Sequence, residues 1–427
     1  MHHDTPTAAA TARLSHPDPS ERMAALEDLC LAGDPAALIR AAGALLADRD
    51  PAVRELAGRH LAQIGTTEAA AQACPYIASP DIGVRNLAGD VLTRIGAPAV
   101  PVLAAAIDDP DKDVRKFAID VLALLPAWEL SHRIAARLTD EDANVRLAAI
   151  DALGALQATE HQDALLALYE PEPLARPSIV AAMGRFARAG AGVDLAFFGR
   201  ALADEDPVVQ LAAAEALADL DDPSLIDLLI EKAHHVDPMA RPVLLHALVR
   251  LLEVYPDHTA ALPPSLRTHF LDMLADVDLT YVVSAVKGLR LLDAEGTLPD
   301  VLAHAGRDDA LDVEIFHTLL AVPAPLRPLA DAVDRQVLPP DPAAQLALGL
   351  IMQQALAPED LPEAAALLVD HFDALDAETK IAALNLCLHL NEEALFGLVE
   401  AGLRDPDPTV QDFASDAAQD LGLAPSY

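Results

Sequence analysis

Asp50-Pro51-Ala52-Val53-Arg54 is the clearest copy of a five-residue pattern that recurs along this chain. The pattern is an acid, two variable residues, a small or β-branched residue, and then Arg or Gln. Three close copies follow at spacings of 31, 30 and 31 residues, starting at Asp81, Asp111 and Asp142. Weaker copies bring the total to about thirteen units, and they span Asp18–Arg22, Glu172–Arg176, Asp206–Gln210, Asp237–Arg241, Asp278–Val282, Asp309–Val313, Asp341–Gln345, Asp376–Lys380 and Asp407–Gln411.

Each copy predicts the start of a helix. An acid is a good N-cap because its carboxylate accepts amide hydrogens of the first turn, and Pro suits the next position because no amide hydrogen is needed there. After Asp50, the apolar residues fall on one stripe of a 3.6-residue helix, at Val53, Leu56, Ala57, Leu61 and Ile64. Gly65 and Gly96 follow two of these stripes, as helix ends prefer.

The rest of each unit holds a second apolar run, such as residues 99–107. A unit is therefore a helical hairpin that is too small to bury its own apolar face, and such hairpins must stack. Composition agrees, because hydrophobic residues make up 52% of the 427 residues while aromatic residues make up only 4%. Cores of Ala, Leu, Val and Ile are typical of packed helices. We predict an all-α solenoid.

The Asp-Pro-x-Val-Arg signature in a unit of about 31 residues resembles HEAT repeats, especially the short bacterial kind similar to the repeats of phycobilisome bilin lyases. The resemblance implies a right-handed α-α superhelix. The match is regular over residues 1–250, whereas over 251–427 it is carried mainly by spacing, so we expect degenerate repeats that continue the same solenoid. The 41-residue interval from Asp237 to Asp278 predicts an insertion or a bend.

Charge limits the choice of partners. The chain carries 67 acidic and 29 basic residues, for a formal net charge of −38. Such a charge repels nucleic acid and anionic membranes, so we expect neither as a partner. No apolar run reaches the roughly twenty residues that cross a bilayer. The three cysteines are far apart, and the start of the chain lacks a secretory pattern, so we expect a cytoplasmic protein.

A ladder of acids and arginines is the most conspicuous polar feature, and we interpret it as structural. In each copy the Arg stands four residues after the acid, which suits an ion pair within the first turn or with the neighbouring unit. HEAT-like families use such ladders to join repeats, and the resemblance therefore argues against a ligand-binding role. The best-defined members are Asp50, Arg54, Asp81, Arg85, Asp111, Arg115, Asp142 and Arg146.

A second series predicts the binding surface. The residue nine positions after each acid lies opposite the apolar stripe, on the helix that resemblance to HEAT proteins places on the concave side. Most members are acids, which predicts a negatively charged groove, although a solvated face of an acidic protein would show the same pattern. The expected groove residues are Glu27, Arg59, Asp90, Asp120, Asp151, Glu215 and His246.

Motifs for chemistry are missing from the sequence. The adjacent histidines His234 and His235 form the only internal cluster, and no spacing typical of metal ligands is present. No phosphate-binding loop and no nucleophile elbow occur. We therefore expect no metal, no cofactor and no enzymatic activity.

Three functions compete at this point. The first is a non-enzymatic scaffold or adaptor that holds a basic or helical protein partner in the acidic groove. The second is a bilin lyase-like or chaperone-like factor, which only the shared repeat type supports. The third is a DNA glycosylase, which would need a basic groove and is disfavoured by the charge.

Overall fold

The structure is a computed structural model that describes residues 6–423. Helices and the turns between them account for all of these residues, and the part of the chain described contains no β-strand. The predicted all-α class is therefore confirmed. No single described helix is long and apolar enough to cross a membrane, and the one bent pair that has the length and composition, Ile82–Ile95 with 97–108, is bent by 119°.

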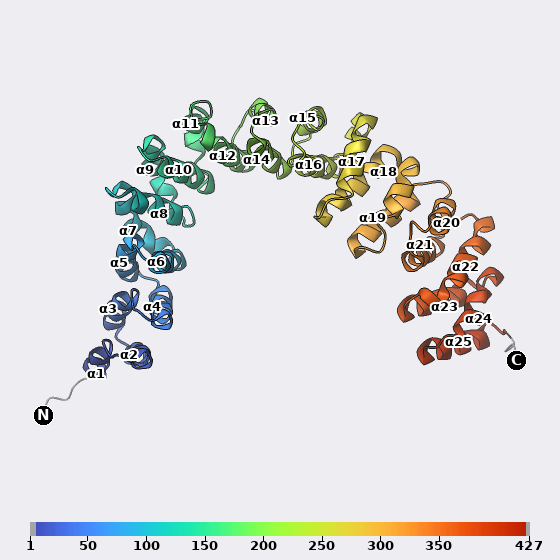
Figure 1. Cartoon of the computed structure of the whole chain (residues 1–427), viewed down its shortest axis with the longest axis horizontal. Helices are drawn as coiled ribbons and strands as arrows, with labels where there is room; N and C mark the ends of the chain where they lie inside the picture. Colours follow the sequence, from blue (N-terminus) through green and yellow to red (C-terminus); the bar gives the residue numbers. More distant parts are fainter. Residues whose placement is uncertain (1–5, 424–427) are drawn as a thin grey trace. The chain divides into compact units, whose positions relative to one another are not determined.

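The chain forms two compact units, Met1–Leu220 (unit 1) and Asp221–Tyr427 (unit 2). In unit 1, long helices alternate with shorter ones, several of which pass into a turn of 3-10 helix (Figure 1). The helices of unit 1 are α1 Pro6–Arg13, α2 Pro19–Leu31, α3 Pro35–Leu45, α4 Pro51–Ile64, α5 Thr67–Ala73, α6 Ile82–Ile95, α7 Val100–Ala104, α8 Lys112–Leu122, α9 Ser131–Ala135, α10 Ala143–Ala155, α11 Gln162–Leu166, α12 Arg176–Arg188, α13 Leu195–Ala201 and α14 Pro207–Ala218.

In the structure, we count a repeat as a short helix together with the long helix that follows it. Corresponding helices of successive repeats pack side by side. The even-numbered helices of unit 1 form one continuous row, in which α4 contacts α6, α6 contacts α8, and so on to α14. Figure 1 shows this row on one side of the unit, with the odd-numbered helices on the other. The predicted apolar stripe faces the core, because Val53, Ala57 and Leu61 are fully buried. Hairpins about 31 residues apart are neighbours, as the stacking argument requires.

Nine helices begin where the acids predict. In each of them the acid is the N-cap, and its carboxylate accepts a backbone N–H of the first turn. Gly65 ends α4 in the left-handed conformation, with φ of 64°, as the sequence indicates. These N-caps are Asp18, Asp50, Asp81, Asp111, Asp142, Asp206, Asp278, Asp376 and Asp407.

Four other starts differ from the prediction. Helices α12 and α16 begin at Arg176 and Arg241, four residues after the expected acids, because Pro177 and Pro242 then occupy the first turn, where proline is tolerated. The N-cap of α19 is one residue earlier than expected, at Asp308, and α21 follows Pro339. The expected acids at these four places, listed in chain order, are Glu172, Asp237, Asp309 and Asp341.

Unit 2 keeps the alternation of longer and shorter helices with less regular spacing. The long interval after Asp237 contains the 3-10 helices Pro256–Ala261 and Pro264–Leu266, which accounts for the predicted insertion. Its helices are α15 Leu225–Lys232, α16 Arg241–Val254, α17 Arg267–Met273, α18 Leu279–Leu302, α19 Asp309–Leu320, α20 Leu326–Asp334, α21 Pro340–Met352, α22 Leu361–Asp370, α23 Ala377–Leu390, α24 Phe396–Gly402 and α25 Pro408–Asp420.

Helix α18 is two helices joined at a kink. Asp293 has non-helical backbone angles, φ −166° and ψ 84°, and its carboxylate accepts the N–H of Gly296 at 2.9 Å. Asp293 therefore caps the second half of α18, which contains Pro299 near its start. The two halves serve as the long helix of one repeat and the short helix of the next.

Candidate functional site: the ladder and the even-helix face

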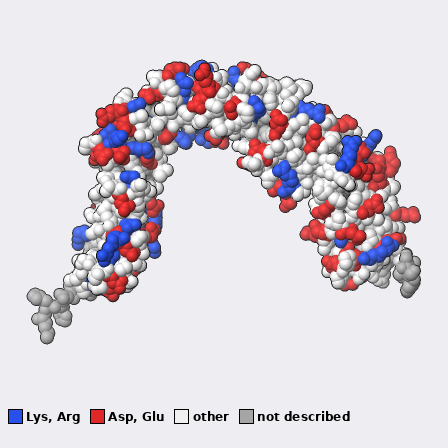
Figure 2. Space-filling view, in the orientation of Figure 1, with Lys and Arg blue, Asp and Glu red and all other residues white. Residues whose placement is uncertain are grey.

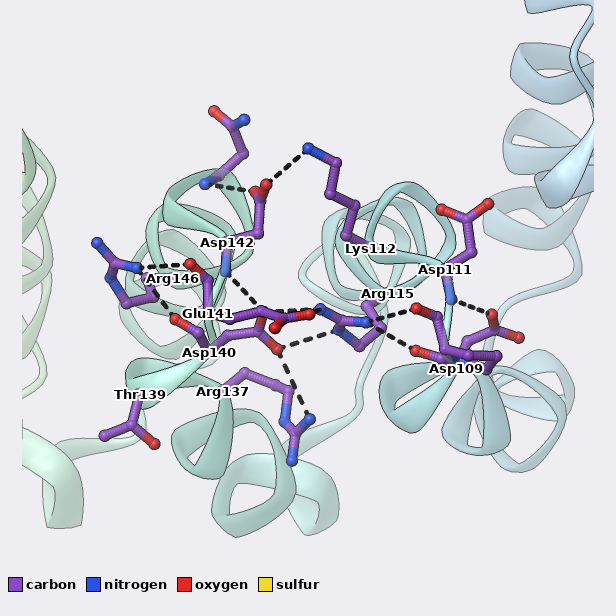
Figure 3. Close-up of polar contacts among 12 residues, drawn as sticks. Asp109, Asp111, Lys112, Arg115, Arg137, Thr139, Asp140, Glu141, Asp142 and Arg146 are labelled. Atoms are coloured by element: carbon purple, nitrogen blue, oxygen red, sulfur yellow. Dashed lines mark hydrogen bonds and ion pairs between the residues drawn. The ribbon is translucent and has the colours of Figure 1, made fainter.

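The ladder arginines bind backbone carbonyls of the preceding turn. Arg115 donates from Nη1 to the carbonyl of Asp109, six residues earlier, at 2.9 Å. Arg54 makes the same bond to Asp48 at 2.8 Å, Arg146 to Asp140 at 3.0 Å, and Arg85 to Ser79 at 3.3 Å. Each base thus fixes the loop that leads into its own helix, and Figure 3 shows this arrangement around Arg115 and Arg146.

Several of these side chains also reach the next repeat. Arg115 binds the carboxylate of Asp140 through two parallel bonds of 3.0 and 2.8 Å, and both side chains are buried (Figure 3). Arg22 binds Asp48 in the same bidentate manner at 2.8 and 2.6 Å. Equivalent single ion pairs join neighbouring repeats elsewhere, and they are Arg146–Glu172, Arg176–Asp204 and Lys380–Asp405.

Apart from Glu172, the acceptors of these bonds are acids that the sequence analysis did not select. Most stand two residues before an N-cap, and their carboxylate also accepts the N–H of that N-cap residue, as Asp140 does from Asp142 at 3.1 Å. A repeated Asp-x-Asp pattern was the available signal. The acids at this position are Asp48, Asp109, Asp140, Asp204, Asp276 and Asp405.

The environment of the pairs favours their charged forms. The hydrogen bond from Arg115 lowers the pKa of Asp140 below its usual value, although burial acts in the opposite direction. Burial also raises the pKa of Asp48, but hydrogen bonds from Arg22 and from the N–H of Asp50 outweigh it and the net shift is downward. The pairs Arg22–Asp48 and Arg115–Asp140 are therefore favoured in their charged forms at the joints between repeats.

The four selected ladder acids mainly cap helices. Asp50, Asp81 and Asp111 accept backbone N–H groups two residues on, at 2.8–2.9 Å. Asp142 does so as well, and it also accepts from Lys112 Nζ of the preceding repeat at 2.8 Å (Figure 3). Arg115 and Arg146 thus pair with other acids, and not with the N-cap acids of their own units.

The predicted groove residues of unit 1 lie on the long helices. We call the exposed surface of α2, α4, α6, α8, α10, α12 and α14 the even-helix face. Glu27, Arg59, Asp90, Asp151 and Glu215 are exposed there and Asp120 is half-buried. Glu27 and Arg59 line one hollow of about 530 Å³ between α2 and α4. His246 lies in unit 2, on α16, where it is half-buried and its Nδ1 lies 2.7 Å from Ser284 Oγ.

Local ion pairs balance some of these acids. Asp90 pairs with Arg94 at 3.5 Å and Asp120 with Lys116 at 2.6 Å, each on its own helix. Among the described residues, Asp151 and Glu215 have no ion pair. Figure 2 shows that carboxylates outnumber basic side chains over the visible face of the chain. Among the predicted groove acids, Asp151 on α10 and Glu215 on α14 thus keep uncompensated negative charge.

Apolar side chains accompany the uncompensated acids. Val208, at the start of α14, is 51% exposed, and Leu174, just before α12, is 86% exposed. Leu147 and Leu211 are half-buried on α10 and α14, four residues before Asp151 and Glu215 respectively. This end of the even-helix face can therefore offer both carboxylates and apolar contact to another molecule.

Metal binding has no support in the described residues. Within residues 6–423, no three His, Cys, Asp or Glu side chains converge in a way that could hold a metal ion. The three cysteines are unpaired thiols, and Cys387 is buried with a pKa raised by desolvation to about 11. The chemistry of the ladder and of the even-helix face is that of ion pairs and surface contacts.

Comparison with known proteins agrees with this geometry. The family model for HEAT repeats matches residues 7–93 and 100–184. These residues of the chain form HEAT repeats. The HEAT signature lies in unit 1, where the ladder is most regular, and the further likeness to the phycobilisome-related type stays a prediction. No curated protein matches the chain.

Solved HEAT-repeat solenoids resemble the chain in fold. Kap95p, in a complex in which its binding induces the switch loops of RanGDP to adopt the GTP-bound conformation, has a TM-score of 0.55 and 11% identity, over 99% of this chain and 69% of Kap95p. The Kap95:Nup1 complex has a TM-score of 0.56 and 12% identity, over 96% of this chain and 61% of the matched chain. Importin beta in an ammonium sulfate condition has a TM-score of 0.52 and 16% identity, over 97% of this chain and 62% of importin beta. The chain thus spans about two thirds of these structures.

Proposed function

We propose that this HEAT-repeat protein is a non-enzymatic cytoplasmic scaffold that holds a basic, helical segment of a protein partner on the even-helix face of unit 1. The row of exposed carboxylates, with Asp151 and Glu215 unpaired among the described residues, is the observation that supports it most directly. The unpaired thiols fit a reducing compartment. An extended repeat surface is commonly used to bind another chain.

Charge and apolar contact together favour an amphipathic helix as the bound segment. Lysines or arginines of such a helix can reach Asp151 and Glu215, while its apolar stripe contacts Leu147 and Leu211. Charge complementarity raises the rate of association and discriminates against acidic partners. The relatives in complex with RanGDP and Nup1 show that solenoids of this fold can hold other proteins.

The test compares charge reversal on two sides of unit 1. Asp151→Lys with Glu215→Lys reverses the even-helix face, and Glu129→Lys with Asp163→Lys makes the same change in net charge on the exposed odd-numbered side. The tagged wild-type chain and both double variants are used for affinity purification from the native host at about 50 and 300 mM salt, with quantitative mass spectrometry. We expect the wild type to capture partners whose binding weakens as the salt concentration rises. Only the even-helix variant should lose these partners.

The outcome is decided by the contrast between the variants. Equal capture by all three proteins, with unchanged helicity by circular dichroism, would contradict the even-helix face as the binding surface. Loss of capture in both variants would show that net charge alone drives the association.

A further inference from the structure

A serine and two histidines form a hydrogen-bonded chain on unit 2, outside the ladder. Ser265 Oγ lies 3.0 Å from His234 Nε2, and His234 Nδ1 lies 2.9 Å from His269 Nε2. His234 follows α15, while Ser265 and His269 stand one turn apart in the helical stretch formed by Pro264–Leu266 and α17. The ring of His234 therefore bridges two residues on the same face of that stretch.

The inserted segment of the long repeat creates this arrangement. Ser265 stands at its end, directly after Pro263 and Pro264, and the interval from Asp237 to Asp278 is about ten residues longer than the other units. Insertions in repeat proteins project from one surface and often carry function. Ser265 and His234 are both exposed, so a small molecule can reach the serine.

The two hydrogen bonds can run in the direction that moves a proton away from the serine. When Ser265 donates to His234 Nε2, the proton of His234 is on Nδ1 and donates to His269 Nε2. His269 then carries its own proton on Nδ1, which is buried and has no hydrogen-bond partner. Desolvation lowers the pKa of His269, with Arg241 and His234 acting in the same direction and Asp272 against it, so His269 stays neutral and able to accept.

We propose that Ser265 is a nucleophilic serine that accepts acyl groups from activated esters, with His234 as general base and His269 as the residue that positions His234. A nucleophile within hydrogen-bond reach of a base, which a third group orients, is the arrangement that activates a serine hydroxyl. The site belongs to unit 2, whereas the non-enzymatic scaffold role proposed above belongs to the even-helix face of unit 1, so the reaction would be a second activity of the chain.

The reaction balances without a further reagent. Ser265 Oγ attacks the carbonyl carbon of an aryl ester, an Oγ–C bond forms, and the serine proton moves to His234 Nε2. The C–O bond to the aryl group then breaks, and His234 returns the proton to the departing phenolate oxygen. Water, activated by the same histidine, releases the acid from Ser265. His269 accepts the Nδ1–H of His234 throughout and does not change its own protonation.

The test uses a fluorophosphonate probe on the full-length chain. Attack of Ser265 Oγ on phosphorus releases fluoride, and peptide mass spectrometry locates the covalent adduct. We expect one adduct, on Ser265, that is absent in Ser265→Ala and forms at least about 100-fold more slowly in His234→Gln, because general-base assistance contributes roughly that factor. Ser224→Ala is the matched control, since Ser224 is exposed and bonds to Asp222 and to no histidine.

Two variants of His269 separate positioning from folding. His269→Gln keeps a hydrogen-bond acceptor near the place of Nε2 and should label within a few-fold of the wild type, whereas His269→Leu removes the acceptor and should label slowly. Circular dichroism verifies that each variant is folded. Absence of an adduct on the folded wild type, an adduct on another residue, or unchanged labelling of His234→Gln would overturn the proposal.

Discussion

At the scale of single residues, the ladder is defined by the groups to which each charged side chain bonds. Arg115 bonds both to carbonyls of its own repeat and to the carboxylate of Asp140 in the next one. Asp140 in turn accepts the N–H of Asp142. One ion pair therefore fixes the entrance to two successive helices, and its loss leaves buried polar groups on both sides of a joint.

Replacing Asp140 by Ala should destabilise unit 1 strongly. The side chain of Arg115 is only 7% exposed, and breaking a buried pair typically costs about 3 kcal/mol because the remaining charge stays buried. Urea denaturation followed by circular dichroism measures the change. Glu141→Ala is the control, since Glu141 is 88% exposed and 3.8 Å from the same Arg, and a loss of equal size there would contradict the assignment.

The penalty of Asp140→Ala should depend on pH. The pKa of Asp140 is lowered in the folded chain, so its contribution is fully present above the pKa of an unfolded Asp, about 3.9, and is lost as the pH falls through the lower folded value. The difference in unfolding free energy between wild type and variant should therefore be constant from about pH 5 to 8 and shrink toward pH 3. Urea midpoints at these pH values test this, and a gap that widens in acid would have the wrong sign.

Single residues also show which parts of the ladder a sequence can reveal. The arginines stand out because bases are rare in this chain, and the periodicity alone identifies them. Acids are abundant, so the partner acids, such as Asp48 and Asp140, look like ordinary turn residues until the structure shows their bonds. Ser265 and His234 are 31 residues apart, and no local pattern in the sequence indicates that their side chains meet.

At the scale of helices, close packing of neighbouring repeats depends on small residues. Gly184 of α12 faces Ala216 of α14 so closely that a Cβ atom at position 184 would lie 2.5 Å from the Cβ of Ala216 and 3.1 Å from its Cα. Real Cβ atoms do not approach to 2.5 Å, and the nearest obstacles belong to a short, inflexible side chain. The two helices would have to move apart.

Gly184→Ala should therefore lower the melting temperature, with a destabilisation of about 1–3 kcal/mol that reflects overpacking. Gly192→Ala is the matched control, because Gly192 is exposed and a Cβ there meets no atom within 4 Å. Thermal denaturation of both variants, followed by circular dichroism, measures the two melting temperatures. A similar loss of stability at both positions would contradict the packing explanation, because the reduced backbone entropy of the unfolded chain acts in the stabilising direction.

Helix starts were predictable where the signals in the sequence agree. Asp50 and Asp81 cap their helices because the acid, the apolar stripe and the spacing agree. The starts of α12 and α16 were missed because Pro177 and Pro242 compete with the expected acids for the first turn. The unit that starts at Asp278 was predicted to be a helical hairpin, but the position of its turn, at Asp293, was not located from the sequence.

At the scale of the whole molecule, charge acts against the folded state. A net charge of −38 produces repulsion that the folded chain must overcome, while the ladder pairs are mostly buried and poorly screened by salt. The division into regular repeats over 1–250 and degenerate repeats over 251–427, and the number of repeats, remain predictions. The all-α class is established for the described residues, and HEAT repeats are established for residues 7–93 and 100–184.

Raising the salt concentration should therefore stabilise the protein. We expect the melting temperature to increase between about 50 and 500 mM NaCl, because screening reduces the repulsion among carboxylates more than it weakens the buried pairs. Differential scanning calorimetry measures the shift, with potassium chloride as a check for ion-specific effects. A decrease with both salts would indicate that attractive surface ion pairs outweigh the repulsion.

The ladder also determines how the chain would respond to mechanical load. Each of its ion pairs between repeats joins a repeat only to the next one, as Arg22 to Asp48 and Arg115 to Asp140 do. Tension applied to the two ends of a unit would thus be borne by one joint after another in series. Stretched in an optical trap, the chain should lengthen in steps near 100 Å, the contour of one 31-residue repeat.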